Sequence, residues 1–269
     1  MFAVTTSLHE SEKQLGKALE ISSELDIPYI ERTNKNIEQL LIDNTLDGIL
    51  VVGKNRLTYK YPGGEFFFHP GMAKLRINEI LNGKTDQMIK ALDLRPGDTV
   101  LDCTLGLGSD AIVASFMNKG GRVTGLEQSR IICLIVKKGL AEYTGESDPA
   151  ILLAMRRINV ICDDYNSFLK DMADNSADII YFDPMFRTPG RKSCAMESMR
   201  PLTNNSPLSP EALREAIRVA RRRVVVKESK NSPEFDKLGI CKISGGKYSP
   251  VSYGIIEKGV ASICCEYRS

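Results

Sequence analysis

The chain has 269 residues, of which 42% are hydrophobic and 26% charged, and this composition excludes a disordered tail, a collagen-like fibre and a peptide-sized scaffold. There are 36 lysines and arginines against 34 aspartates and glutamates, so the net charge is +2 and a uniformly basic coat for nucleic acid is excluded. The seven cysteines contain no C-x-x-C pair, which predicts a reducing, cytoplasmic location and no metal site. The sequence contains neither a signal peptide nor an apolar run long enough to span a membrane, so we expect no membrane partner.

The first 68 residues predict a small α/β unit. The expected elements are a strand at residues 2–6, a helix at 15–25, a short helix around 37–41, and one strand or a hairpin over 48–61. Glycines and prolines flank three phenylalanines in segment 61–77, which we expect to be a connector, with helical residues from 75 to 94. The expected domains are a small N-terminal unit at 1–68, a connector and helix at 69–97, and a larger domain at 98–269.

Strands and helices alternate regularly from residue 98 onward. Strands are expected at 99–102, 122–127, 159–162, 178–182 and 223–226, helices at 109–118, at 129–140 and from 210, and a hairpin at 240–256. Ser209 and Pro210 are typical of a helix start, because the hydroxyl can cap the first turn and proline suits its first position. This alternation predicts an α/β fold with a mostly parallel sheet, helices on both faces and an antiparallel edge.

The segment VLDCTLGLGSD, residues 100–110, joins the first of these strands to the first helix. Gly106 and Gly108 permit a close backbone approach where open α/β sheets bind ligands. A dinucleotide site is one interpretation, since G-L-G-S-D-A fits GxGxxA and Glu127 closes the next strand. In that fingerprint, however, the first glycine directly follows the strand, whereas here Asp102, Cys103, Thr104 and Leu105 precede Gly106. An acid that ends the strand, followed by a glycine bend, is similar to the S-adenosylmethionine loop of class I methyltransferases.

Carboxylates around this loop suit S-adenosylmethionine, which carries a sulfonium and an ammonium group and no phosphate. Asp102 and Asp110 would lie near its amino-acid end, and Glu127 can accept hydrogen bonds from both ribose hydroxyls. Either Asp163 or Asp164, after the following strand, can reach the adenine amine. The alternative is purely structural, because any strand-to-helix turn favours glycine and any helix start favours aspartate.

A tetrapeptide, Asp183-Pro-Met-Phe186, ends the strand at 178–182. It is similar to the D/N-P-P-Y/F segment of amino methyltransferases. Asp183 and the carbonyl of Pro184 could accept the two hydrogens of an exocyclic base amine, and Phe186 could stack on the base. The alternative is that Asp-Pro merely terminates a strand.

Three segments together give a narrower resemblance: VLDCTLGLGSDAIVAS at 100–115, YFDPMFRTPGRKSCAMESMR at 181–200 and RRVVVKES at 222–229. Over residues 98–230 the chain resembles the small-subunit ribosomal RNA guanine-N2 methyltransferase J family. The resemblance implies a Rossmann-like class I fold with a seven-stranded sheet, S-adenosylmethionine as cofactor, and methylation of a guanine N2 amine in 16S ribosomal RNA. Ribosomal RNA or the small ribosomal subunit is then the expected partner.

Matching positions of the family motifs add further candidates for the cofactor site. The complete set is Asp102, Gly106, Gly108, Ser109, Asp110, Glu127, Gln128, Asp163, Asp164, Tyr165 and Asp183. The chain departs from the family at residues 103–105, at Ser109 and at Asp163–Asp164, which leaves the adenine contacts open. The amino-terminal portion matches poorly and could redirect the choice of substrate.

Basic residues are concentrated between residues 186 and 230, where eleven lysines and arginines face four glutamates. The window is therefore +7, which predicts a basic patch beside the amine pocket. Candidate RNA contacts are Arg187, Arg191, Lys192 and Lys227, although Lys227 lies in a strand and could instead have a structural or active-site role. Arg214 and Arg218 are expected to be a solvated helix face.

Other functions remain open from the sequence. The acceptor could be another nucleic acid or a small amine, or the chain could be a non-catalytic RNA-binding module for ribosome assembly that keeps the cofactor pocket. A dehydrogenase is the least favoured. The three phenylalanines at 66–68 could stack on RNA, but we expect some of them to pack between the two units.

Overall fold

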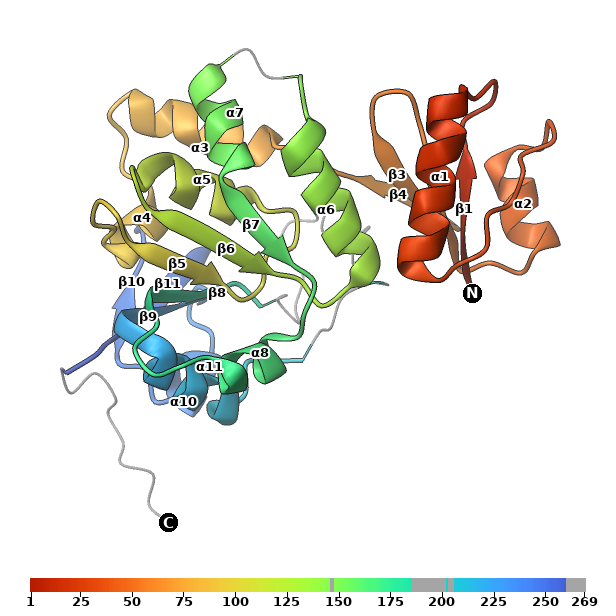
Figure 1. Cartoon of the computed structure of the whole chain (residues 1–269). Helices are drawn as coiled ribbons and strands as arrows, with labels where there is room; N and C mark the ends of the chain where they lie inside the picture. The colour runs from red at the N-terminus through yellow and green to blue at the C-terminus, as the bar shows by residue number, and fades with distance from the viewer. Residues whose placement is uncertain (146–147, 185–201, 203–205, 260–269) are drawn as a thin grey trace.

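The computed structural model describes residues 1–145, 148–184, 202 and 206–259, which form two β-sheets with flanking helices (Figure 1). The smaller sheet is built from the first quarter of the chain and the larger one from the remainder. The described chain is therefore α/β, as predicted.

The smaller sheet contains, in spatial order, β1 (Phe2–Thr6), β2 (Gly48–Val52), β3 (Leu57–Tyr61) and β4 (Gly64–Phe67). β1 and β2 are parallel and the other pairs are antiparallel. Helix α1 (Glu12–Leu25) packs on one face and helix α2 (Ile37–Asp43) on the other, because alternate residues of β1 and β2 belong to two separate hydrophobic clusters.

Residues 61–77, which we expected to be a connector, are largely regular structure. Pro62 and Gly63 form a tight turn, with Gly63 at φ +92°, and β4 returns along β3 so that Tyr61 pairs with Gly64. Proline followed by glycine is the order typical of a type II turn. Helix α3 (Gly71–Leu81) starts before residue 75, where a helix was expected, and helix α4 (Gln87–Leu92) follows it.

The larger sheet has the strand order β10-β11-β9-β8-β5-β6-β7. Its strands are β5 (Thr99–Asp102), β6 (Arg122–Leu126), β7 (Ile158–Ile161), β8 (Ala177–Phe182), β9 (Ala220–Ser229), β10 (Lys242–Ser244) and β11 (Val251–Glu257). Strands β5 to β9 are parallel, and β10 and β11 form the antiparallel edge. This confirms the predicted seven-stranded sheet with its C-terminal hairpin. Strand β9 extends beyond the predicted 223–226 at both ends.

Helices cover both faces of the larger sheet (Figure 1). One face carries α3, α4, α5 (Ser109–Met117), α6 (Arg130–Glu142) and α7 (Pro149–Arg156), and the other α8 (Tyr165–Asp171), α10 (Pro210–Val219) and α11 (Glu234–Lys237). The start of α10 is as predicted, with Ser209 as the cap and Pro210 as its first residue. Helices α7, α8 and α11 were not predicted, because four to eight residues give too little periodicity.

The two sheets share one hydrophobic cluster. Phe66 and Phe68 are buried in the same cluster as α6, and a Cβ added to Gly139 of α6 would lie 2.1 Å from Cγ of Phe68. Phe67 instead lies under the Arg56 guanidinium, 3.8 Å from the ring centroid. The expectation that some of the three phenylalanines pack between the units is thus confirmed for Phe68.

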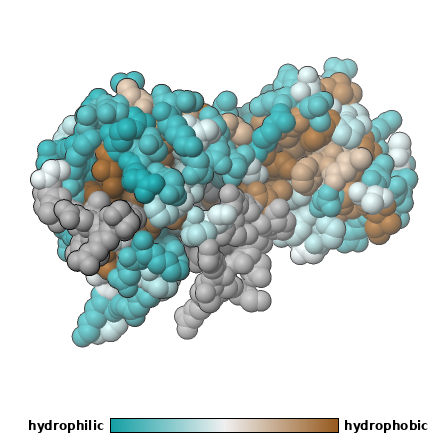
Figure 2. All heavy atoms as spheres, turned by 90° about the horizontal axis from the view of Figure 1, so that it is seen from below, coloured by the Kyte–Doolittle hydropathy of each residue, from teal (hydrophilic) through white to brown (hydrophobic). Residues whose placement is uncertain are grey.

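Apolar side chains gather over the smaller unit on the face shown in Figure 2, whereas the larger unit is mostly hydrophilic there. Within the described residues, no helix is both long and apolar enough to cross a bilayer. The described ranges also contain no cluster of histidine, cysteine and acidic residues suited to a metal ion.

We expect Gly139→Ala to lower the free energy of unfolding by about 1–3 kcal/mol, because the added methyl group overlaps the Phe68 ring. Gly16→Ala in α1 is the matched control, since its Cβ would meet nothing within 4 Å and should raise stability by up to about 1 kcal/mol. Urea unfolding of both variants measures the difference. If the two variants changed the free energy of unfolding equally, the packing of Phe68 would not require a glycine at position 139.

Candidate active site

The acidic residues predicted from the sequence meet at one edge of the larger sheet. Asp102, Glu127, Asp163 and Asp183 stand at or just beyond the carboxyl ends of β5, β6, β7 and β8. These strands are parallel, so their carboxyl ends share one edge, which is where open α/β sheets bind ligands. The same edge holds the start of α5, including Ser109 and Asp110.

The glycine loop between β5 and α5 is held on both sides. The Thr104 hydroxyl accepts a hydrogen bond from the Asp183 amide at 2.6 Å, and the Leu105 amide donates to the Leu126 carbonyl at 2.9 Å. Gly106 and Gly108 have φ of +49° and +74°, a conformation that other residues rarely adopt. The loop is therefore fixed between the ends of β8 and β6. Sequence reasoning gave Thr104 no role.

Glu127 is oriented by two backbone amides. Its carboxylate accepts hydrogen bonds from Gly106 at 3.1 Å and from Ser129 at 2.8 Å, one on each oxygen. Burial raises the pKa of Glu127, and the two amides oppose that rise. Each oxygen keeps a second lone pair, so the carboxylate can accept further hydrogen bonds from a pair of neighbouring hydroxyls.

Asp163 and Asp164 differ in what already binds them. Asp164 caps α8, accepting from the Asn166 amide at 2.6 Å on one oxygen and from Gln128 Nε2 at 2.8 Å on the other. Asp163 accepts from the Asp164 amide and from the Ser167 hydroxyl, both on Oδ1. Within the described residues Asp163 therefore has the less occupied carboxylate. Tyr165 packs edge-on against the ring of Phe182, with the ring centroids 5.5 Å apart.

A buried cation links two of the predicted carboxylates. The Lys227 ammonium lies 2.7 Å from Oδ2 of Asp183 and 3.1 Å from Oδ2 of Asp110, and the Tyr181 hydroxyl donates to that same Asp110 oxygen at 2.6 Å. Lys227 was predicted as an RNA contact, with a structural or active-site role as the alternative. Its side chain is only 18% exposed and paired with two acids, which favours the alternative.

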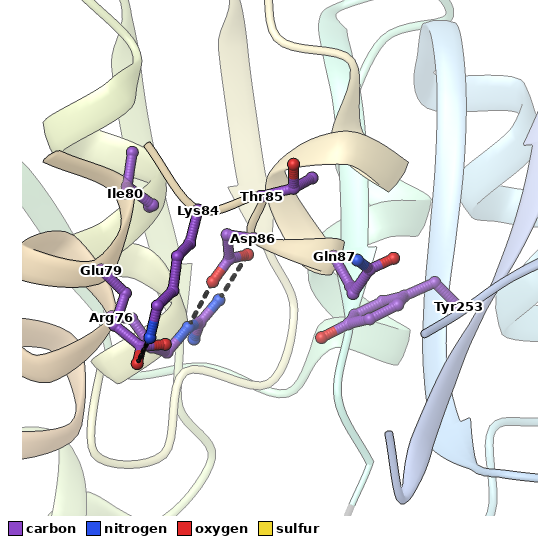
Figure 3. A pocket seen from close by; sticks show the side chains of 8 residues that line it. All are labelled: Arg76, Glu79, Ile80, Lys84, Thr85, Asp86, Gln87 and Tyr253. Carbon is purple, nitrogen blue, oxygen red and sulfur yellow. Dashed lines mark hydrogen bonds and ion pairs between the residues drawn. The ribbon is translucent and has the colours of Figure 1, made fainter. Parts of the chain in front are cut away.

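Arg76 of α3 completes this network, and sequence reasoning missed it. Its guanidinium forms two hydrogen bonds with Asp86, at 2.8 and 3.0 Å (Figure 3), and a further one with Oδ1 of Asp110. Arg76 lies between Ala73 and Ile77, which are both fully buried. An arginine on the apolar face of a helix was the signal that could have identified it.

Burial and charge give these carboxyl groups different proton affinities. Burial raises the pKa of Asp102 to about 8, opposed by the Thr104 amide. Burial also raises the pKa of Asp183 to about 6; Lys227 opposes the rise and Asp110 adds to it. At Asp110, Lys227 and Arg76 outweigh burial and hold the pKa well below its usual range. Asp110 thus has the larger share of the neighbouring positive charge.

The predicted basic patch is largely neutralised in the part of the chain that is described. Arg221, Arg222 and Arg223 pair with acids at the opposite, amino-terminal edge of the sheet, so they do not face the site. Arg218 was expected to lie on a solvated helix face, but its guanidinium donates hydrogen bonds to the carbonyls of Leu169 and Met172. Arg214 is exposed, as predicted.

Several candidates lie outside the described residues, namely Phe186, Arg187, Arg191 and Lys192. Pro184, the residue after Asp183, is described and buried at the end of β8.

Comparisons with known proteins agree with this architecture. A family model for SAM-dependent methyltransferases matches residues 50–245. The uncharacterized protein YpiP of Bacillus subtilis (strain 168) is 40% identical over 257 residues, covering 94% of this chain and 98% of that protein. The ribosomal RNA small subunit methyltransferase J of Pseudomonas syringae pv. tomato is 33% identical over 165 residues, 58% of this chain and 59% of that protein. A SAM-dependent methyltransferase structure from Neisseria gonorrhoeae has a TM-score of 0.65 over 97% of both chains at 19% identity, which supports the fold alone.

The residues at the carboxyl edge fit S-adenosylmethionine. Asp102 is 2% exposed and accepts one hydrogen bond, from Thr104, among the described residues. Such a carboxylate lacks a positive partner, and a sulfonium or ammonium group would supply one. The remaining lone pairs of Glu127 suit ribose hydroxyls, and Gly106 and Gly108 adopt left-handed backbone conformations that favour glycine. We propose that Asp102, Glu127 and Asp163 contact the cofactor, while Asp110 and Asp164 are mainly engaged by protein groups.

We expect Glu127→Ala to weaken S-adenosylmethionine binding by roughly 10- to 100-fold, the effect of losing hydrogen bonds to a charged acceptor. Glu127→Gln should lose less, because its side-chain oxygen still accepts. Isothermal titration calorimetry measures the dissociation constants, with Glu142→Ala at the end of α6 as the control. An unchanged constant for Glu127→Ala would remove this residue from the cofactor site.

Proposed function

Since this chain belongs to the family of SAM-dependent methyltransferases, with S-adenosylmethionine as its cofactor, we propose that its acceptor is the exocyclic N2 amine of a guanine in 16S ribosomal RNA. The observation that carries the proposal is the position of Asp183-Pro184. A carboxylate and a backbone carbonyl stand together at the end of β8, on the edge where the cofactor residues gather. The 33% identity to a ribosomal RNA small subunit methyltransferase supports this choice of substrate.

The amine must be turned toward the methyl group, because its lone pair is delocalised into the base and makes it a weak nucleophile. Lys227 donates to Oδ2 of Asp183, and the described residues place no donor on Oδ1. Oδ1 is therefore available to accept one N2 hydrogen, and the carbonyl of Pro184 can accept the other. Two fixed acceptors hold the nitrogen in one orientation, so positioning supplies most of the catalysis.

The bound cofactor supplies a methyl group on a sulfonium sulfur, which an amine nitrogen can displace directly. The nitrogen gains a bond to the methyl carbon as the carbon–sulfur bond breaks and the sulfur becomes a neutral thioether, and the nitrogen must lose one proton. Asp183 already accepts one N2 hydrogen, so its carboxylate takes that proton. The raised pKa of Asp183 suits this role, because a carboxylate with a pKa near 6 is a better base than an ordinary one and is still ionised at neutral pH.

The proposed partner is ribosomal RNA or the small ribosomal subunit, which would place the protein in the cytoplasm. A second candidate is amino methylation of another nucleic acid. It is favoured by the extent of the similarity, since the matched region of the ribosomal RNA methyltransferases spans only 58% of this chain. YpiP, which matches nearly the whole chain, does not decide between these acceptors.

We expect a strain that lacks the gene to lose one N2-methylguanosine from its small-subunit ribosomal RNA, measured by mass spectrometry of nuclease digests. The wild-type gene should restore the modification and Asp183→Asn should not, because an amide is a poorer acceptor and cannot take the proton. A modification pattern unchanged by deletion would overturn the ribosomal assignment. A cellular role rescued by Asp183→Asn would indicate a non-catalytic RNA-binding module.

The rate of methyl transfer should fall as the pH drops through about 6, because the pKa of Asp183 is raised to about 6 and only its ionised form accepts the amine hydrogen. Activity is thus present above this pKa and is lost below it. Initial rates with labelled donor, measured between pH 5 and 8 at saturating cofactor, test the expectation. A rate that is constant down to pH 5 would mean that Asp183 does not titrate during the reaction.

A further inference from the structure

Arg76 lies where two parts of the molecule meet. It belongs to α3, which precedes the methyltransferase sheet, yet its guanidinium contacts both Asp86, the cap of α4, and Asp110, the second residue of α5. All three side chains are largely buried, with exposed fractions of 21%, 10% and 11%. A pocket of about 190 Å³ opens beside the Arg76–Asp86 pair, and Tyr253 of β11 lines its far side (Figure 3).

Charges of alternating sign run from this pocket to the catalytic carboxylate. Asp86 pairs with Arg76, Arg76 with Asp110, Asp110 with Lys227, and Lys227 with Asp183. The two oxygens of Asp110 have separate partners, since Arg76 bonds Oδ1 while Lys227 and Tyr181 bond Oδ2. Removing the positive charge of Arg76 therefore leaves the negative charge of Asp110 less neutralised and strengthens its attraction for Lys227.

Lys227 is shared between two carboxylates, and its attraction to each depends on what else neutralises them. Arg76 supplies a positive charge to Asp110, while the described residues give Asp183 no cation other than Lys227. Without Arg76, Asp110 would be a buried anion with one cation, and it would attract Lys227 away from Asp183.

We propose that Arg76 is a positioning residue for Asp183, acting through Asp110 to keep Lys227 on the Asp183 carboxylate and that carboxylate ionised. The importance of this arrangement for catalysis rests on the proposed role of Asp183. The arrangement itself can be tested without any substrate.

Other groups around Asp183 and Lys227 are also ionisable and stay in place in the test. They are Asp102 of β5, Asp110 of α5, Tyr181 of β8 and Tyr253 of β11. Burial raises the pKa of Tyr181 and of Tyr253 well above the ordinary value, so both stay neutral throughout the acid range. Burial raises the pKa of Asp102 to about 8, so Asp102 is largely protonated where Asp183 titrates, and Asp110 carries the neighbouring negative charge. This makes the positive charge of Arg76 on Asp110 significant for Asp183.

A purely structural role for Arg76 is the competing explanation. Its hydrogen bonds join α3, α4 and α5, and any change that loosens this joint could disturb the site. The two explanations predict different shifts in the pKa of Asp183 when Asp86 is changed. Asp86→Asn loosens the joint but removes a negative charge, whereas Arg76→Met loosens the joint and removes a positive charge. Asparagine has nearly the shape of aspartate and is an equally good helix cap, so α4 should persist.

The experiment measures the pKa of Asp183 directly, by NMR titration of its side-chain carboxyl carbon in cofactor-free protein labelled with ¹³C-aspartate. Asp183→Asn identifies the signal. Arg76→Met should move the midpoint upward by about one pH unit, and Asp86→Asn should move it downward by a smaller amount. Arg222→Met is the matched control, because Arg222 also forms a buried pair with an aspartate, Asp98, but at the opposite edge of the sheet. It should leave the midpoint unchanged.

The proposal is overturned if Arg76→Met leaves the midpoint in place, or if Arg76→Met and Asp86→Asn move it in the same direction. Should Arg76→Met fail to fold, Asp86→Asn alone tests the proposal. A downward shift of the Asp183 midpoint supports the proposed role of Arg76, and any other result contradicts it. The acid limb of the methylation rate should follow the same shifts. If Asp183→Asn keeps full activity while the Asp183 midpoint moves as expected in the other two variants, the proposed function fails but the proposed role of Arg76 is supported.

Discussion

The Lys227 ammonium, held between Asp110 and Asp183, is the interaction on which the site depends. Three elements bring these side chains together, since Lys227 comes from β9, Asp183 follows β8, and Asp110 belongs to the first turn of α5. A buried lysine with two acids costs desolvation energy, and replacing such groups with apolar ones is often neutral or stabilising. The network is better understood as a device that fixes the position and charge of Asp183 than as a source of stability.

The glycine loop depends on the same arrangement. Thr104 accepts the amide hydrogen of Asp183 while its own amide donates to Asp102, so the ends of β5 and β8 are tied by one residue. Gly125 in β6 leaves room for Leu105, since a Cβ there would lie 2.4 Å from a methyl group of Leu105. A single short loop therefore ties together the ends of β5, β6 and β8.

Much of this site could be predicted from the sequence because it follows from periodicity. An acid lies at or just beyond the end of β5, β6, β7 and β8, and parallel strands end at a common edge, so the meeting of Asp102, Glu127 and Asp183 could be predicted from the sequence. Arg76 was missed because its partners lie in other elements, and helix periodicity alone does not reveal them.

The basic patch predicted from residues 186–230 is largely neutralised in the described residues for a related reason. Arg221, Arg222 and Arg223 count as positive in the sequence, but acids distant in the chain neutralise them. The β4 strand was missed because its hydrophobic triplet hides the alternation that marks a strand.

The contact between Phe68 and Gly139 also has a consequence for how the chain acquires its structure. Phe66 and Phe68 belong to the smaller unit, yet the cluster that buries them includes residues of α6. During synthesis the smaller unit emerges first, but its apolar surface stays open to water until α6 has followed. The first part of the chain therefore cannot complete its folding ahead of the second, and both units should gain their stability in one late, cooperative step.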